Sequence, residues 1–230
     1  MHDNRTILLT EDGSHTIYNP EIGDIYHSKF GALSESEHIF INTGLKQITS
    51  TQQTICILEV GFGTGLNALL SCLYAINNSA GICYYALEPF PLPETIYSKL
   101  NYSHQFTETG IQEIFMALHA APFNKQTAIS GNFTLIKVDS PVEEHKLNDK
   151  QFDLVYFDAF SPDVQPGVWS QKIFQNIYKA TKPNGILVTY SSRGMVKRNL
   201  LNAGFNIYKL PGPRGKREII KAVKPSTSND

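Results

Sequence analysis

Several features that define other protein classes are scarce in this sequence of 230 residues. It has three cysteines, Cys56, Cys72 and Cys83. Their odd number and wide spacing argue against a disulfide framework or a CxxC metal site, so we predict that each is a small buried side chain. The seven histidines show no HExxH or paired spacing. We therefore expect a protein without a metal site.

Long apolar runs and a strong net charge are absent as well. The N-terminus is polar, and neither a signal peptide nor a membrane span is visible, which predicts a cytoplasmic protein that does not bind membranes. The formal net charge is -1, so no global field attracts nucleic acid or anionic lipid. Any surface that binds RNA must be a local patch.

Strands and helices alternate from about residue 54, and 41% hydrophobic residues can build a core beneath them. We expect strands at residues 55–60, 82–87, 133–138, 152–158, 186–190, 205–210 and 217–223. We expect helices at residues 66–76, 91–100, 111–118, 170–181 and 192–203. This alternation predicts a Rossmann-like α/β fold: a mostly parallel sheet with helices on both faces and a C-terminal antiparallel strand.

The expected domain organisation has three parts. Residues 1–50, with short apolar pieces between turn signals, form a small N-terminal extension over the cofactor cleft. Residues 51–225 form the main domain, and residues 226–230 a flexible tail. In such a fold, ligands bind beyond the carboxyl ends of the strands, so residues just after each strand are the candidates for function.

A glycine-rich turn follows the first strand of the main domain, with the sequence EVGFGTGLN at residues 59–67. Glycines let the backbone turn tightly into a helix and let a ligand lie against it. A dinucleotide fingerprint, G-x-G-x-x-G, would need glycine where Leu66 stands. The acid-led spacing instead matches the turn of class I methyltransferases, and we assign cofactor binding to Glu59, Gly61, Gly63, Gly65 and Asn67.

Two more acids follow strands. Glu88 ends the second strand of the main domain, where a carboxylate can accept hydrogen bonds from a ribose diol. Asp139 follows the third, where class I methyltransferases hold the adenine amino group. A solvated charge at a strand end and a helix cap are the structural alternatives for these two residues.

The fourth strand leads into Asp158, Ala159 and Phe160. A carboxylate at the end of a central strand is costly to bury without a partner, so Asp158 should face the cleft. Methyl transfer to nitrogen needs an amine that has lost its proton. Asp158 can orient such an amine, help to remove its proton, or both, and Phe160 can pack on its flat surface. We also expect Asp158 to contact the cofactor, and capping of the next turn is the alternative role for this residue.

Segments spread over nearly the whole chain resemble the tRNA 5-aminomethyl-(2-thio)uridine methyltransferase family, known as MnmD when free-standing and as the methyltransferase half of MnmC when fused. They are TEDGSHTIY (10–18), YHSKFGALSESEHIF (26–40), LEVGFGTGLN (58–67), FDAFSP (157–162), TYS (189–191), residues 194–204 and GKRE (215–218). The loop after the fourth strand, DVQPGVW (163–169), departs from the pattern because it lacks a lysine of the fused members.

The resemblance implies S-adenosyl-L-methionine as cofactor and methylation of the exocyclic amine of a modified wobble uridine, which gives the methylaminomethyl form. It also implies that Tyr26, Ser28 and Glu35 help to enclose the methyl donor, although a well-packed N-terminal flap would explain them too. The fused members carry a flavin oxidase that makes the aminomethyl substrate. We expect no fused oxidase domain here, and therefore a separate source of the substrate.

The C-terminal third of the chain is locally basic, and between Arg193 and Lys224 only Glu218 opposes the positive charges. Phosphate contact is the expected use of such a patch, with tRNA held by its anticodon stem-loop, while a solvated surface is the alternative. We expect a monomer. The predicted substrate-binding residues are Phe160, Tyr190, Arg193, Lys197, Arg198, Lys216 and Arg217. Tyr190 and Trp169 could stack on a base, although we favour packing for Trp169.

Three other functions remain open at this point. The chain could be a small-molecule N-methyltransferase or an aminopropyltransferase of the same fold. A nicotinamide oxidoreductase is disfavoured by Leu66 and by the lack of a convincing catalytic dyad. A binding module that has lost its chemistry is weakly opposed by the presence of Glu59, Glu88 and Asp158.

Overall fold

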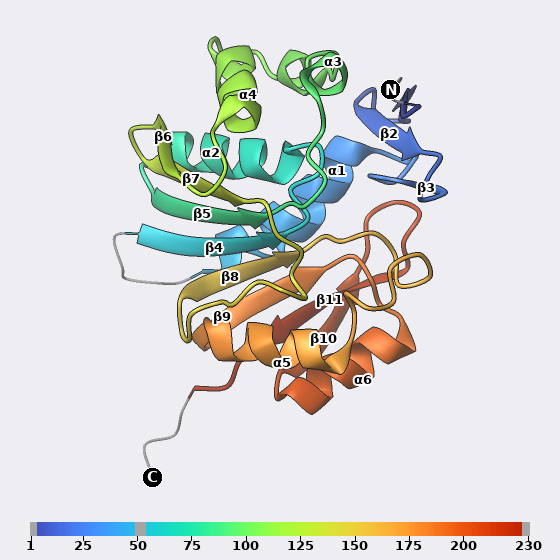
Figure 1. Ribbon diagram of the computed structural model, residues 1–230, viewed down its shortest axis with the longest axis vertical. Helices are drawn as coiled ribbons and strands as arrows, with labels where there is room; N and C mark the ends of the chain where they lie inside the picture. Colours follow the sequence, from blue (N-terminus) through green and yellow to red (C-terminus); the bar gives the residue numbers. More distant parts are fainter. Residues whose placement is uncertain (1–3, 49–53, 227–230) are drawn as a thin grey trace.

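The computed structural model describes residues 4–48 and 54–226, and its centre is an eight-stranded sheet in the order β10-β11-β9-β8-β4-β5-β7-β6 (Figure 1). Five neighbouring strands are parallel: β9 (Thr181–Thr189), β8 (Phe152–Phe157), β4 (Thr54–Val60), β5 (Gly81–Leu87) and β7 (Phe133–Val138). At one edge, β11 (Glu218–Val223) pairs antiparallel with both β9 and β10 (Asn206–Pro211). The predicted Rossmann-like fold with a C-terminal antiparallel strand is confirmed.

Helices cover both faces of this sheet (Figure 1). One face carries α2 (Leu66–Asn78) and α4 (Ile111–Ala120), and the other carries α5 (Gln171–Ala180) and α6 (Gly194–Ala203). Two hydrophobic clusters correspond to the two faces. The first contains Leu69 of α2 and strand residues such as Tyr84, and in the second, Phe174 of α5 lies against Phe157.

The N-terminal segment forms a small unit beside the carboxyl ends of the parallel strands. It contains a three-stranded sheet of β1 (Thr6–Leu9), β2 (His15–Asn19) and β3 (Asp24–Ile25). The helical pieces α1 (Ala32–Ser36), η1 (Glu37–Asn42) and η2 (Leu45–Gln47) follow it. Ile17, Ile39 and Phe40 belong to the same hydrophobic cluster as α2, so this segment shares a core with the main sheet.

Three expectations about local structure were wrong. The helix expected at 91–100 is reduced to α3 (Glu94–Tyr97), followed by the short η3 (Tyr102–Gln105), because the prolines at 91 and 93 disfavour helical backbone before them. The strand β6 (Gln126–Ser130), antiparallel to β7, was not expected. The strand expected at 186–190 begins earlier, at Thr181, and an irregular register within β9 accommodates Asn184 at positive φ.

Of the cysteines, Cys72 is buried, while Cys56 and Cys83 are half-buried and face each other across β4 and β5. The wide spacing in the sequence did not predict this neighbourhood. No helix within residues 4–48 and 54–226 is long and apolar enough to cross a membrane. Of the tail predicted at 226–230, residues 227–230 lie outside the described residues, as do the residues at the predicted 50/51 boundary.

Candidate active site

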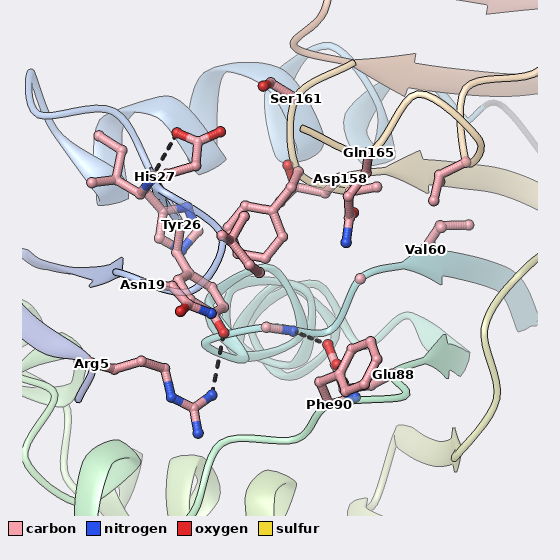
Figure 2. Close-up of a pocket in the computed structure, with 18 of the residues that line it drawn as sticks. Arg5, Asn19, Tyr26, His27, Val60, Glu88, Phe90, Asp158, Ser161 and Gln165 are labelled. Atoms are coloured by element: carbon pink, nitrogen blue, oxygen red, sulfur yellow. Dashed lines mark hydrogen bonds between the residues drawn. The ribbon is translucent and has the colours of Figure 1, made fainter. Parts of the chain in front are cut away.

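The carboxyl ends of β4, β5 and β8 open onto one cavity of about 1590 Å³. Its wall includes the turn after β4, the ends of the other two strands, and the N-terminal segment from Asn19 to Phe30. Asp158 and Glu88, which come from two different strands, both border the space around Tyr26 in Figure 2. The cavity is larger than a typical site for one small ligand, about 300–1,000 Å³, so two ligands can meet in it.

The turn after β4 brings backbone, rather than side chains, to the cavity wall. Gly61 and Gly63 line the cavity at φ values of +90° and +51°. A Cβ atom at Gly61 would lie 2.8 Å from the carbonyl oxygen of Asp158, and one at Gly63 would lie 3.2 Å from the ring of Tyr26. Only glycine therefore lets the turn approach both the Asp158 loop and the N-terminal segment.

Two neutral histidines hold Thr64 in the middle of this turn. His119 of α4 donates from Nε2 to the Thr64 carbonyl over 3.0 Å, and His27 Nε2 lies 2.7 Å from the Thr64 hydroxyl. Burial lowers the pKa of His27 to about 4 and that of His119 to about 3. Both rings are therefore uncharged at neutral pH, and they fix the turn without adding charge behind it.

Glu88 follows β5 and is almost fully buried at the edge of the cavity. Its two carboxylate oxygens accept backbone N–H groups, Oε2 from Gly63 and Oε1 from Phe90, both over 2.8 Å (Figure 2). Burial raises the pKa of Glu88, and the two hydrogen bonds and the charge of Arg5 oppose that rise. Glu88 thus ties the glycine turn to the end of β5 and keeps further lone pairs for a ligand.

Asn67 of α2 links Glu59 to Asp158. Its Nδ2 group donates to Glu59 Oε1 over 3.0 Å and to Asp158 Oδ2 over 2.9 Å. Glu59 is fully buried, and its pKa is raised, mainly by burial. The first acid of the glycine turn therefore acts through Asn67, which orients the carboxylate of Asp158.

Asp158 lines the cavity directly after β8. Burial is the main cause that raises its pKa well above the usual value, and the charge of Glu35 adds to the rise. The hydrogen bond from Asn67 and the charge of Lys216 oppose it. The proton affinity of Asp158 is therefore higher than that of an exposed aspartate and closer to that of an amine.

The N-terminal segment and the loop between β10 and β11 meet beside Asp158. Lys216 of that loop lies 2.5 Å from Glu35 Oε1, and its ammonium group lies 4.9 Å from the centre of the Tyr190 ring. Glu35 Oε2 accepts the backbone N–H of Ser28 over 2.8 Å. Tyr26, Ser28, Glu35, Tyr190 and Lys216 all line the cavity. Residues from both ends of the chain therefore complete one wall.

Several predicted site residues lie outside the cavity wall, as far as residues 4–48 and 54–226 show. Glu59, Gly65 and Asn67 lie behind it, and Lys197, Arg198 and Arg217 lie away from it. Asp139 is exposed, and the chain after it places Pro141, Val142 and Glu143 in the wall instead. The contact of Asp139 with the donor stays a prediction.

The expected basic patch is less positive than the local sequence indicated. Arg193 pairs with Asp163, Lys216 with Glu35, and Arg214 with Glu11, so distant segments supply acids that the local count missed. Lys197 and Lys209 both contact Glu218. Lys224 is buried and donates to the carbonyls of Tyr178 and Thr181 at the end of α5, and therefore does not belong to the surface patch.

Arg193, Phe160 and Tyr190 remain at the cavity, whereas Trp169 does not. Trp169 is fully buried against Phe157, so it packs in the core and cannot stack on a base. The sequence reading also missed Arg5, Asn19, His27 and Lys99, which line the cavity. His27 lies in the resembling segment 26–40, which assigned it no role, and no motif marks the other three. Only the tertiary contacts of the N-terminal segment and of the loop before η3 bring these residues to the cavity.

Comparison with known proteins places this geometry in a family. Residues 104–225 match the model of a family described as S-adenosyl-L-methionine-dependent methyltransferase. The chain is 30% identical over 217 residues to the tRNA 5-methylaminomethyl-2-thiouridine biosynthesis bifunctional protein MnmC of Campylobacter hominis, covering 93% of this chain and 32% of that protein. It is 28% identical over 230 residues to MnmC of Cupriavidus metallidurans, covering 94% and 33%. The chain spans about a third of the length of these relatives.

Two solved structures align with nearly the whole of this chain. The crystal structure of MNMC2 from Aquifex aeolicus aligns with a TM-score of 0.76 at 26% identity, over 99% of this chain and 73% of that one. Spermidine synthase from Thermotoga maritima aligns with a TM-score of 0.54 at 12% identity, over 97% and 71%, which shows a shared fold alone.

Proposed function

This chain belongs to the S-adenosyl-L-methionine-dependent methyltransferases, and we propose that it methylates the exocyclic amine of 5-aminomethyl-(2-thio)uridine at the wobble position of tRNA. The product would be 5-methylaminomethyl-(2-thio)uridine. The names of the MnmC relatives support this substrate, as does the resemblance over both ends of the chain. The observation that carries the proposal is the link from Glu59 through Asn67 to Asp158, which joins the glycine turn to a carboxylate in one cavity.

The residues present fit the methyl donor. Gly61 and Gly63 present bare backbone to the cavity, and Glu88 offers carboxylate lone pairs to the hydroxyls of a ribose. S-adenosyl-L-methionine supplies an electrophilic methyl group on a positively charged sulfur. Tyr26, Ser28 and Glu35 would enclose it from the N-terminal side.

Asp158 would position the substrate amine and receive its proton. An ammonium group has no lone pair, so the proton must leave before nitrogen can attack. The raised pKa of Asp158 brings its proton affinity closer to that of the amine, which makes this transfer less unfavourable than for an ordinary aspartate. Phe160 lies two residues after Asp158 and can pack on the flat face of the substrate base.

The decisive test is a methylation assay with radiolabelled donor and tRNA from cells that lack this enzyme. We expect label in the wobble nucleoside after digestion. The Asp158→Ala protein is the matched control and should leave this nucleoside unlabelled. Label only in small amines would instead identify a small-molecule N-methyltransferase. Donor binding without any label would indicate a binding module.

Arg193 is the residue that we expect to contact a phosphate at the cavity mouth. Its ion pair with Asp163 is more than half exposed on both sides, so solvent screens it and a phosphate can replace the carboxylate. Arg193→Gln should weaken tRNA binding. It should also make the slope of the logarithm of the tRNA association constant against the logarithm of the salt concentration less steep by about 0.7–0.9, the value for one phosphate contact. Binding measured between low and moderate salt gives this slope.

Lys179→Gln serves as the matched control, because Lys179 lies in α5 on the outer face of the sheet and does not line the cavity. We expect it to keep the wild-type slope. An Arg193→Gln protein with an unchanged slope would remove this residue from the RNA-binding surface.

A further inference from the structure

Tyr26 and Phe160 form an aromatic contact between the donor side and the substrate side of the cavity. Their ring centres are 4.9 Å apart at an interplanar angle of 74°, an edge-to-face arrangement. The same Tyr26 ring lies 3.2 Å from the position that a Cβ atom of Gly63 would take. The ring therefore fills the space between the glycine turn and the loop that carries Asp158 and Phe160.

The backbone of this loop is fixed at three successive residues. The N–H of Asp158 donates to the carbonyl of Val60 over 3.0 Å. The hydroxyl of Tyr190 donates to the Ala159 carbonyl over 2.9 Å, and the Nε1–H of Trp169 donates to the Phe160 carbonyl over 2.8 Å. Because Trp169 is fully buried, it anchors the backbone of Phe160 to the core, and the Phe160 side chain then lies beside Tyr26.

We propose that the Tyr26–Phe160 contact limits the enzyme to one methyl group per amine, an inference that rests on the proposed function. A second transfer would begin from the neutral secondary amine. Its lone pair would form a new N–C bond while the methyl–sulfur bond breaks. The sulfur of S-adenosyl-L-methionine would keep that electron pair as the neutral thioether of S-adenosylhomocysteine, and the tertiary ammonium would release a proton.

Space beside Asp158 decides whether this second step occurs. The secondary amine must rotate to point its lone pair at the methyl group of a second S-adenosyl-L-methionine. Its own methyl group must then occupy a position that a hydrogen held during the first transfer. On this proposal, the Phe160 ring, which lies against Tyr26 and lines the cavity two residues after Asp158, takes up the space that the added methyl group would need.

The test is mass analysis of the wobble nucleoside after exhaustive methylation by Phe160→Leu and Tyr26→Leu. The wild-type protein should add one methyl group only, and each variant should produce a substantial dimethylated fraction. Two matched controls should form no dimethylated product, whatever effect they have on the rate of the first methylation. Tyr26→Phe keeps the ring, and Phe90→Ala enlarges the cavity beside Glu88 rather than beside Asp158.

Binding without the methyl donor gives a second readout that does not depend on turnover. We expect the wild-type protein to bind an anticodon stem-loop with a dimethylaminomethyl group at least about tenfold more weakly than the monomethylated one, the order of effect of one misplaced methyl group in a packed pocket. Phe160→Leu should bind both alike. Equal wild-type affinities, or turnover by both leucine variants without dimethylated product, would overturn the inference. Failure of the wild-type protein to methylate the nucleoside at all would instead overturn the proposed function.

Discussion

Asp158→Asn should lower kcat by about 10²–10⁴-fold, the usual contribution of a positioned acid or base, while the Kd for S-adenosyl-L-methionine changes little. The amide has nearly the same shape as the carboxylate and can still accept the hydrogen bond from Asn67. It cannot take a proton from the substrate ammonium. Single-turnover kinetics with saturating tRNA, combined with calorimetry of donor binding, separates these two effects.

Asp163→Asn is the matched control for this variant. Asp163 also lines the cavity, but its side chain is mostly exposed and pairs with Arg193 at the mouth. We expect kcat to stay close to the wild-type value. An equal loss of donor affinity in Asp158→Asn would show that Asp158 belongs to the donor site rather than to the amine.

The pH profile gives an independent check on Asp158. Its raised pKa means that the carboxyl group stays protonated up to a higher pH than an exposed aspartate, and only the ionised form can accept the proton. The rate should therefore fall with decreasing pH through a limb that lies above the normal aspartate range. This limb should be absent in Asp158→Asn.

Glu88→Gln should raise the Kd for S-adenosyl-L-methionine by about 10–100-fold, since hydrogen bonds to a charged group contribute about 1.5–3 kcal/mol and 1.4 kcal/mol is a factor of ten. The change removes the charge that would accept the ribose hydroxyls. It also replaces one oxygen that accepts from Gly63 or Phe90 by an amide donor. Calorimetry with the donor alone measures the effect without tRNA.

Glu94→Gln is the control for that measurement, because Glu94 is an exposed acid in the nearby α3 that does not line the cavity. Its donor affinity should remain that of the wild-type protein. If Glu88→Gln bound the donor normally, the carboxylate would only stabilise the glycine turn, and another residue would have to bind the ribose.

Local patterns predicted those parts of the site that depend on a short stretch of chain. The glycine turn follows β4, Glu88 follows β5 and Asp158 follows β8. Parallel strands end at the same edge of a sheet, so three strand ends imply one common site. The helix expected at 91–100 starts late for a local reason as well, because Pro91 and Pro93 delay the start of α3 to Glu94.

Contacts between distant segments could not be predicted in this way. Asn67 and Asp158 are 91 residues apart in the chain, and nothing in either segment marks the other as its partner. The same holds for Lys216 with Glu35, and for Arg193 with Asp163, which reduced the expected basic patch. Local charge counts fail where folding supplies the opposite charge.

The sequence alone determined the fold class, the order along the chain of the main-sheet strands other than β6, and the acids and glycines at the strand ends, because periodicity and turn chemistry act over a few residues. Only the tertiary structure decided that Asn67 connects two acids, that neutral His27 and His119 hold the glycine turn, and that Tyr26 lies between Gly63 and Phe160. These features depend on how separate segments pack against one another, and packing geometry is not encoded in any one of them.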